Sequence, residues 1–447
     1  MNETDRGHWG SRLGFIAAAA GSAIGLGNIW RFPYITGKFG GGFFVLIYIL
    51  ILIFVGYPVM NSELLLGRKT QLAAVGTFKK LAPGTPWVIV GFMGVLAGFV
   101  ILSYYSVVAG WALAYMFKSG VYMAVGADHG SIFVASITST WGGIFWHTVF
   151  MLLCIAVVAG GVEKGIEKWS LILMPVLVLL LIILIIRSVT LPGAGAGLSF
   201  YLTPNFANFS GAGFLAAVGQ VFFTLSLGMG CMITYGSYLK KEEDIPLVAR
   251  YVVISDTAVA LLAGFVIFPA VFAFGLEPGA GPGLTFITLP AVFAKMGGAG
   301  HVFGFIFFTL LMIAALTSAI SLLEVVTAYS IDEMKFDRKK ATIGAGVLIW
   351  ALGLLPTLGY STLSHITLIK GMDILDSFDF FANNMLLPLG GMLTAIFIGW
   401  YWGTDKALEE ANISAGTKLG SNYAFLIKYV VPIAIFVVFL NSVGLLG

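Results

Sequence analysis

Apolar residues fill long, nearly uninterrupted stretches of this chain, and short polar or charged segments separate them. A stretch of about 20 apolar residues is long enough to cross a bilayer as a helix. Eleven such spans are predicted, at about 11–37, 42–67, 86–118, 141–160, 168–190, 213–238, 246–274, 301–331, 341–357, 376–402 and 422–446. Numbered one to eleven, they predict an all-α polytopic membrane protein with a single transmembrane domain over 1–447.

Composition agrees with this pattern and excludes a soluble globular protein. Of 447 residues, 59% are hydrophobic and only 10% are charged, and the mean hydropathy is +0.98. Cys154 and Cys231 both lie in apolar spans, so no extracellular disulfide framework is expected. The first apolar run has no small-residue cleavage site, and we expect no cleavable signal peptide.

Span one contains an interruption where a membrane helix would be deepest in the bilayer. Three glycines stand at Gly21, Gly25 and Gly27, and Asn28 and Arg31 follow them. Glycine weakens a helix interior by about 1 kcal/mol relative to alanine, so the helix is expected to break near 22–28. The glycines alone fit a helix-packing face equally well. The polar residues in the same span favour a binding site.

A second interrupted segment lies in span six, between Gln220 and Gly230. Thr224 and Ser226 precede its glycines. Spans one and six are five spans apart, an odd number, so a repeat of spans one to five in spans six to ten must be inverted in the membrane. We therefore predict two inverted repeats, about 11–190 and 213–402, with span eleven (422–446) added. Broken helices in corresponding positions of two halves point to a transport site at the midplane.

Span eight carries three hydroxyl residues within about one turn, at Thr317, Ser318 and Ser321. Each could simply bond back to its own helix. Together with carbonyls freed by the break in span one, they would form an oxygen-only site, which suits a hard cation such as sodium.

Carboxylates inside the spans require partners because an unpaired charge is costly there. Asp256 in span seven must face a cation, face a donor cluster or be protonated. Glu63 in span two could accept bonds from N–H groups freed by the break in span six. Glu324, near one end of span eight, could instead face water.

Span five contains Gly165 near its start and Pro175 ten residues later. Proline removes a backbone donor and kinks a helix. The pair is consistent either with an end that unwinds to hydrate a path from the cell interior or with a static kink.

Charged residues between the spans predict the orientation. With the N-terminus inside, 18 of the 24 Lys and Arg residues fall at cytoplasmic ends. The odd number of spans then places the C-terminus outside.

Several long motifs resemble the neurotransmitter:sodium symporter family, in its bacterial amino-acid branch. They are the segments Arg6–Trp9, Arg12–Gly14, Gly21–Pro33, Gly40–Gly42, Gln220–Gly230, Thr317–Ser318 and Asp373–Phe380. The resemblance runs from residue 6 through span eleven and is strongest to eleven-helix bacterial transporters of several hydrophobic amino acids. It implies the LeuT-type fold and sodium-driven uptake by alternating access. Most family members have a twelfth helix, so an oligomer contact through that helix is not carried over.

The resemblance also implies binding residues. The first sodium site would use Ala23, Asn28, Thr224 and either Ser255 or Asp256; Asp256 departs from the family's usual Asn. The second sodium site would use Gly21, Ile24, Ala314, Thr317 and Ser318. The amino acid would meet Ala23, Leu26, Gly27, Ile101, Tyr105, Phe223, Ser226, Met229, Ser318 and Leu322.

Two gates are implied in the same way. Arg31 and Asp379 would pair on the outside, and Arg6 and Asp332 on the inside, with Trp9 and Tyr238 beside the inner pair. The chloride ligands of animal members are matched only in part, by Tyr48, Gln220 and Thr224, and Asp256 supplies a fixed negative charge nearby. We therefore expect chloride independence.

Together with this resemblance, the sequence predicts a symporter in a bacterial inner membrane that imports hydrophobic L-amino acids with two sodium ions. The alternatives are a proton-coupled exchanger that uses Asp256 or Glu63, a non-transporting amino-acid sensor, and a channel, although a channel would need a continuous polar stripe. An enzyme is not expected, because no metal-ligand cluster or nucleophile–base pair is present. No nucleic-acid partner is indicated by a net charge of +3.

Overall fold

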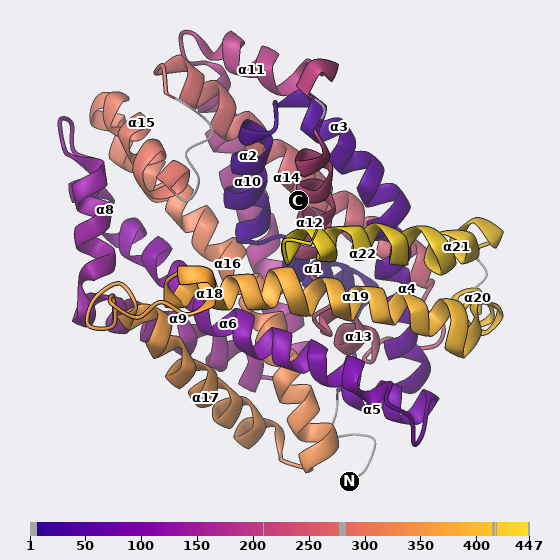
Figure 1. Cartoon of the computed structure of the whole chain (residues 1–447). Coiled ribbons are helices and arrows are strands. Elements are labelled where there is room, and N and C mark those ends of the chain that lie inside the picture. Colours follow the sequence, from indigo (N-terminus) through magenta and orange to yellow (C-terminus); the bar gives the residue numbers. More distant parts are fainter. Residues whose placement is uncertain (1–6, 209, 277–282, 414–415, 417, 446–447) are drawn as a thin grey trace.

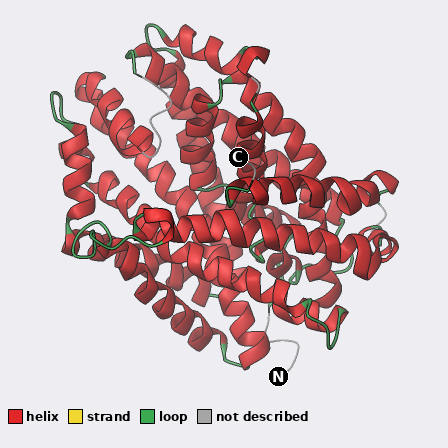
Figure 2. Ribbon diagram, viewed as in Figure 1, coloured by secondary structure: helices red, strands yellow, loops and turns green. Residues whose placement is uncertain are grey.

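The computed structural model describes residues 7–208, 210–276, 283–413, 416 and 418–445. The regular structure in these ranges is helical, with no strand (Figure 1, Figure 2). Nine helices in the described part are long and apolar enough to cross a membrane, or ten if a bent pair counts as one span. The predicted all-α membrane class is confirmed, and the count of eleven spans stays a prediction.

The bent pair is span one. It consists of α1 (Arg12–Ala23), η2 (Gly27–Arg31) and α2 (Phe32–Lys38), and its two halves meet at 50°. The helix ends because Ile24 is extended (ψ 105°). Glycine is required at Gly25, where an added methyl carbon would lie 2.4 Å from Ser318 Oγ and 2.9 Å from the Tyr105 hydroxyl.

Span six is not among these nine or ten helices, because each of its two halves is too short to cross a membrane alone. They are α12 (Gly211–Thr224) and α13 (Cys231–Gly236). The six residues between them include Ser226 (φ 54°) and Gly228 (φ 77°), in the left-handed region. The predicted break in span six is therefore present.

The first half of the chain contains spans two to five. Their helices are α3 (Gly42–Ile51), η3 (Leu52–Gly56), α4 (Tyr57–Thr70), α6 (Val88–Phe117), α9 (Thr140–Ala159), η4 (Val162–Glu167) and α10 (Lys168–Val189). Short helices connect them: α5 (Ala74–Leu81), α7 (Ser119–Tyr122) and α8 (His129–Thr138). Span five begins at Val162, six residues before the predicted start.

The second half contains spans seven to eleven. Their helices are α14 (Ile245–Ala273), α16 (Gly300–Met334), α17 (Arg338–Leu358), α18 (Ile374–Asp379), η9 (Phe380–Leu386), α19 (Leu387–Ile396), η10 (Phe397–Gly403), α20 (Thr404–Ala411), α21 (Ser421–Phe425), η11 (Leu426–Val430) and α22 (Val431–Ser442). The connecting helices are α11 (Ala194–Leu202), η5 (Phe206–Asn208), η6 (Leu284–Thr288), α15 (Leu289–Lys295), η7 (Gly297–Ala299) and η8 (Ile369–Gly371).

The two broken helices occupy the interior of the bundle. The inner half of span one, α1, packs against α10, α14 and α16, and α13 packs against α4 and α16. Helices α19 and α22 lie side by side at the front of the molecule in Figure 1. Non-helical backbone at membrane depth is thus enclosed by protein, as it must be where lipid offers no hydrogen-bond partner.

Candidate functional site

The breaks in spans one and six are bonded to each other. Ser226 Oγ donates to the carbonyl of Ser22 (2.9 Å), and Gln220 Nε2 donates to the carbonyl of Gly27 (2.8 Å). Glu63 Oε1 accepts from the amide of Gly228 (2.7 Å), as expected for an N–H group freed by the break. The two interruptions therefore form one buried polar centre.

The break in span one leaves two carbonyls without their usual helical donors. The amide of Gly25 donates to Asn28 Oδ1 (2.9 Å) instead of the Gly21 carbonyl, and the amide of Asn28 donates to the Gly25 carbonyl (3.2 Å) instead of that of Ile24. Both freed carbonyls point toward span eight. Ser318 Oγ lies 3.5 Å from the first and 3.3 Å from the second.

The hydroxyl of Thr317 completes this cluster. The cluster consists of oxygen atoms only, which is the ligand type that hard cations prefer. The Thr317 hydroxyl lies 3.5 Å from the Ile24 carbonyl and 3.1 Å from that of Ala314. Thr317 and Ser318 each have one hydroxyl proton, and several carbonyl oxygens surround these two hydroxyls at long distances. Some oxygen lone pairs in the cluster therefore have no hydrogen-bond donor. A bound sodium ion would satisfy them. The structure brings together all five residues predicted for the second sodium site.

A second cluster centres on the carboxylate of Asp256, which is fully buried. Asp256 Oδ1 accepts from Asn28 Nδ2 (2.7 Å) and from Thr224 Oγ1 (3.1 Å). Tyr48 contributes a hydroxyl 3.5 Å from Oδ2. Among the described contacts of this cluster, none involves Ser255, which is half-buried. Asp256 therefore lies in this cluster with Asn28 and Thr224, and its role in a first sodium site stays a prediction.

A narrow cavity lies between the two breaks. It is lined by Ser22, Ala23, Gly25, Gly27, Ile101, Tyr105, Phe223, Ser226, Met229, Ser318 and Leu322. Of the ten residues predicted to meet the amino acid, nine line it. The tenth, Leu26, donates its backbone N–H to the Tyr105 hydroxyl (3.2 Å) and lines the neighbouring outer chamber.

Ser22 is a lining residue that the sequence reasoning missed. Its hydroxyl donates to Ser321 Oγ (2.7 Å), and its carbonyl accepts from Ser226 and Ser318. A hydroxyl residue directly after Gly21, within the predicted break, was the available signal.

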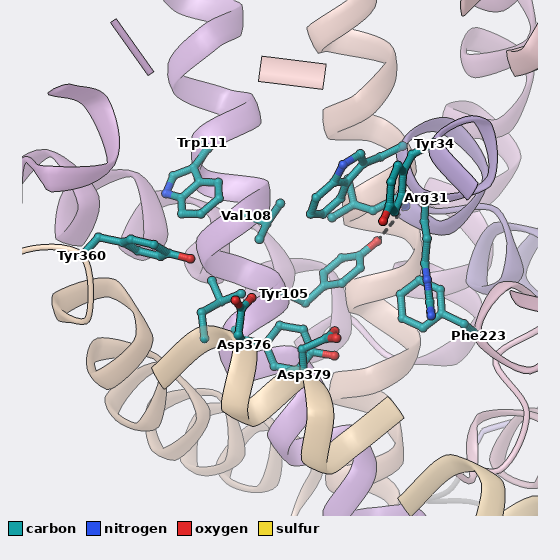
Figure 3. A pocket seen from close by; sticks show the side chains of 13 residues that line it. Arg31, Tyr34, Tyr105, Val108, Trp111, Phe223, Tyr360, Asp376 and Asp379 are labelled. Carbon is teal, nitrogen blue, oxygen red and sulfur yellow. Dashed lines mark hydrogen bonds between the residues drawn. The ribbon is translucent and has the colours of Figure 1, made fainter. Parts of the chain in front are cut away.

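An outer chamber adjoins the cavity, and Tyr105 and Phe223 border both spaces. Figure 3 shows Arg31 beside the Phe223 ring, with Asp376 and Asp379 projecting from α18 into the same chamber. The guanidinium carbon of Arg31 lies 4.8 Å from the centroid of the Phe223 ring. Burial raises the pKa of the Tyr360 phenol at the chamber wall, so this hydroxyl stays neutral.

The predicted outer pair of Arg31 and Asp379 is not formed. Asp379 Oδ1 accepts from Asn383 Nδ2 (2.6 Å) instead, and the ion pairs of the described chain do not include Arg31. Both side chains line the same chamber without forming an ion pair. Asn383 was not predicted. Its position one turn after Asp379 in a membrane helix was a usable signal.

At the other end the structure is closed by Trp9. Its Nε1 donates to the carbonyl of Tyr235 (3.0 Å), and its ring lies edge-on to that of Tyr238, with centroids 6.1 Å apart. Asp332 accepts from the amide of Ala73 (2.6 Å). Arg6 lies outside the described residues, so its pairing with Asp332 stays a prediction.

Glu324 is fully buried and does not face water. It accepts from the Tyr238 hydroxyl (2.5 Å) and from Arg338 (2.5 Å). The partner Arg338 is the first residue of the next helix, α17. The sequence of span eight alone therefore could not show that Glu324 has a buried partner.

The start of span five is wound in this structure. Gly165 lies in η4 and Pro175 lies within α10. Gly165 also has a packing role, because an added methyl carbon would lie 2.1 Å from the carbonyl oxygen of Val157. Unwinding between these two residues stays a prediction.

Comparison with known proteins gives a consistent result. A sequence model of the sodium:neurotransmitter symporter family matches residues 6–124 and 131–446. The sodium-dependent transporter YhdH of Bacillus subtilis is 42% identical over the whole of both chains. A sodium-dependent transporter of Haemophilus influenzae is 37% identical, with 99% of each chain covered. The crystal structure of MhsT in complex with L-phenylalanine matches with a TM-score of 0.90 and 48% identity, over 98% of this chain and all of that one.

Proposed function

This chain belongs to the sodium:neurotransmitter symporter family, and from that premise we propose that it imports hydrophobic L-amino acids, aliphatic and aromatic, together with two sodium ions by alternating access. It is a multi-pass membrane transporter that uses sodium, and not an enzyme. The observation that carries the proposal is the cavity between the two broken helices, flanked by one oxygen cluster on each side.

Coupling would follow from a ligand shared by substrate and ion. The outer half of span one begins at Leu26 and Gly27, and a helix start favours an anionic group. A substrate carboxylate placed there would lie beside Asn28 and would complete the first sodium site. Ion and amino acid then raise each other's affinity by the same factor.

The side chain of the substrate would occupy the apolar end of the cavity, between Ile101, Phe223, Met229 and Leu322. Methionine is flexible and fits side chains of different shape. Aliphatic and aromatic amino acids would both fit for this reason, and the L-phenylalanine bound to MhsT is one of them.

Chloride would not be required. The Asp256 carboxylate already contributes a negative charge next to Tyr48 and Thr224, where an anion would otherwise compensate the sodium charge. The function would be carried out in a bacterial inner membrane with the N-terminus in the cytoplasm and the C-terminus outside.

Uptake into proteoliposomes tests this function. We expect radiolabelled L-phenylalanine to accumulate under an inward sodium gradient, also when gluconate replaces chloride, and unlabelled leucine and tyrosine to compete. Accumulation driven by a pH gradient without sodium would overturn sodium coupling and favour a proton-coupled exchanger. Binding without accumulation under any gradient would favour a sensor.

A further inference from the structure

The inner ends of spans one and five pack in register. Gly14 and Gly21 are seven residues apart on α1, and Glu167 and Met174 are seven residues apart on span five. Seven residues are about two helical turns, so each pair lies on one face. An added methyl carbon at Gly14 would lie 1.9 Å from Glu167 Oε1, and one at Gly21 would lie 3.4 Å from the Met174 sulfur. Span five thus contacts span one at two matched levels.

At the lower level, one buried carboxylate holds the start of α1. Glu167 is only 5% exposed. Its two oxygens accept from the amide of Gly10 (2.7 Å) and from Ser11 Oγ (2.8 Å). Ser11 Oγ in turn accepts from the amide of Gly14 (2.9 Å) and caps the helix. Glu167 therefore fixes the segment directly after Trp9, the ring that closes this end.

At the upper level, the Met174 thioether lies behind the second sodium cluster. It packs at Gly21, whose carbonyl belongs to that cluster, and an added methyl carbon at Gly21 would lie 3.2 Å from Thr317 Cβ as well. A thioether is apolar and only a weak acceptor. Met174 is suited to exclude water from the cluster and is a poor ligand for the ion.

Both contacts belong to one short segment of span five. Glu167 follows Gly165 by two residues, and Met174 directly precedes Pro175. Any unwinding between Gly165 and Pro175 would move the carboxylate and the thioether together.

We propose that Glu167 and Met174 form a two-point clasp of span five on span one, through which sodium release to the cytoplasm and release of the Trp9 segment occur as one event. Their role is to position other groups, and neither side chain contacts the substrate. The inference rests on the proposed function for its sodium readout.

The first test measures the sodium concentration that gives half-maximal L-phenylalanine binding to the purified full chain. Glu167→Gln leaves one oxygen for two donors, and Met174→Ala removes the seal. We expect each to raise this concentration by about tenfold, and Met174→Leu to restore it. The matched controls are Glu163→Gln, an exposed carboxylate on the same turn, and Ile172→Ala, a lipid-exposed residue of the same helix. An unchanged value for Glu167→Gln would overturn the clasp.

The second test does not depend on substrate. Amide hydrogen exchange of the same proteins, in sodium without amino acid, reports opening of residues 10–23 and 166–176 separately. We expect either substitution to accelerate exchange in both segments by about tenfold. Faster exchange limited to the segment next to the changed contact would overturn the coupling. If amino-acid binding to the wild-type protein proves independent of sodium, the proposed function is wrong. The hydrogen-exchange result would still show whether Glu167 and Met174 couple the two segments.

Discussion

At the scale of single residues, the two oxygen clusters proposed to bind sodium have different chemistry. The cluster at Thr317 consists of neutral carbonyl and hydroxyl oxygens, and the cluster at Asp256 contains a carboxylate. The first would hold an ion by oxygen number and geometry alone. In the second, charge neutralisation would contribute most of the ion's stabilisation. Substitutions should therefore affect the two clusters differently.

Thr317→Val keeps the shape of the side chain and removes its oxygen. We expect the half-saturating sodium concentration for L-phenylalanine binding to rise at least about tenfold, because an interaction with a charged group contributes about 1.5–3 kcal/mol. Thr309→Val is the matched control on the same helix, where the hydroxyl is exposed and bonds back to Phe305. Equal sodium dependence of the two variants would contradict the assignment.

Asp256→Asn removes the negative charge and keeps the side-chain size. We expect uptake to become weak in gluconate and to recover in part when chloride is supplied, since an external anion can replace the lost charge. The measurement compares the initial uptake rate in chloride with the rate in gluconate at a fixed sodium concentration. Uptake by the variant that is equally high in both salts would contradict a charge-compensating role for Asp256.

At the scale of elements, each broken helix depends on neighbours that accept its free ends. The break in span six is held by Glu63, whose Oε1 bonds Gly228, and by tight packing on span ten. Local strain and tertiary contact are thus concentrated at the same residues, and this is where a small change should have a large effect.

Gly228→Ala should destabilise the folded protein. The residue has φ +77°, and an added methyl carbon would lie 2.4 Å from the Leu387 carbonyl oxygen. We expect a loss of about 1–3 kcal/mol, seen as a lower Tm in detergent, together with weaker amino-acid binding. Gly219→Ala is the control in the same span, because nothing lies within 4 Å of its added carbon; it should change the Tm little or raise it.

At the scale of the whole molecule, a chamber adjoins the central cavity on one side, and packed side chains around Trp9 lie at the opposite end. The chamber between Arg31 and Asp379 reaches the cavity wall, and at the opposite end Trp9 is only 5% exposed. Under the proposed function, such an arrangement would be one state of an alternating-access cycle, and ligands that bind another state more tightly would shift the population.

A cysteine placed in the chamber reports this shift. Asp376→Cys, at an exposed position of the chamber lining, should react with a membrane-impermeant thiol reagent added outside, and sodium with L-phenylalanine should slow the reaction several-fold as the gate closes. The native Cys154 and Cys231 are buried, so the parent protein gives the background. Labelling from the cytoplasmic side only would contradict the predicted orientation.

Much of the site was accessible from sequence, because its residues cluster around two glycine-rich breaks. The residues themselves predicted that carbonyls freed in span one would face the hydroxyls of Thr317 and Ser318, and the family resemblance named Gly21 and Ile24. Whether Arg31 and Asp379 form their predicted pair could not be decided from the sequence, since conformations of one protein commonly differ by only a few kcal/mol. The partner of Glu324 was hidden because Arg338 comes from the next helix. The early start of span five was missed because Glu163, Lys164 and Glu167 resemble loop residues.

The wall shared by the cavity and the chamber has a pharmacological consequence. If Tyr105 and Phe223 close over the amino acid during the proposed transport cycle, the length of a ligand decides whether it is transported or inhibits transport. An amino acid whose tail ends below these rings would be a transported substrate. An amino acid whose tail passes between the two rings toward Trp111 would prevent their closure and would act as an inhibitor. A series of phenylalkyl glycines of increasing chain length should change from transported to inhibitory at the length where the tail reaches Phe223, and transport of the longest members would disprove this reading of the wall.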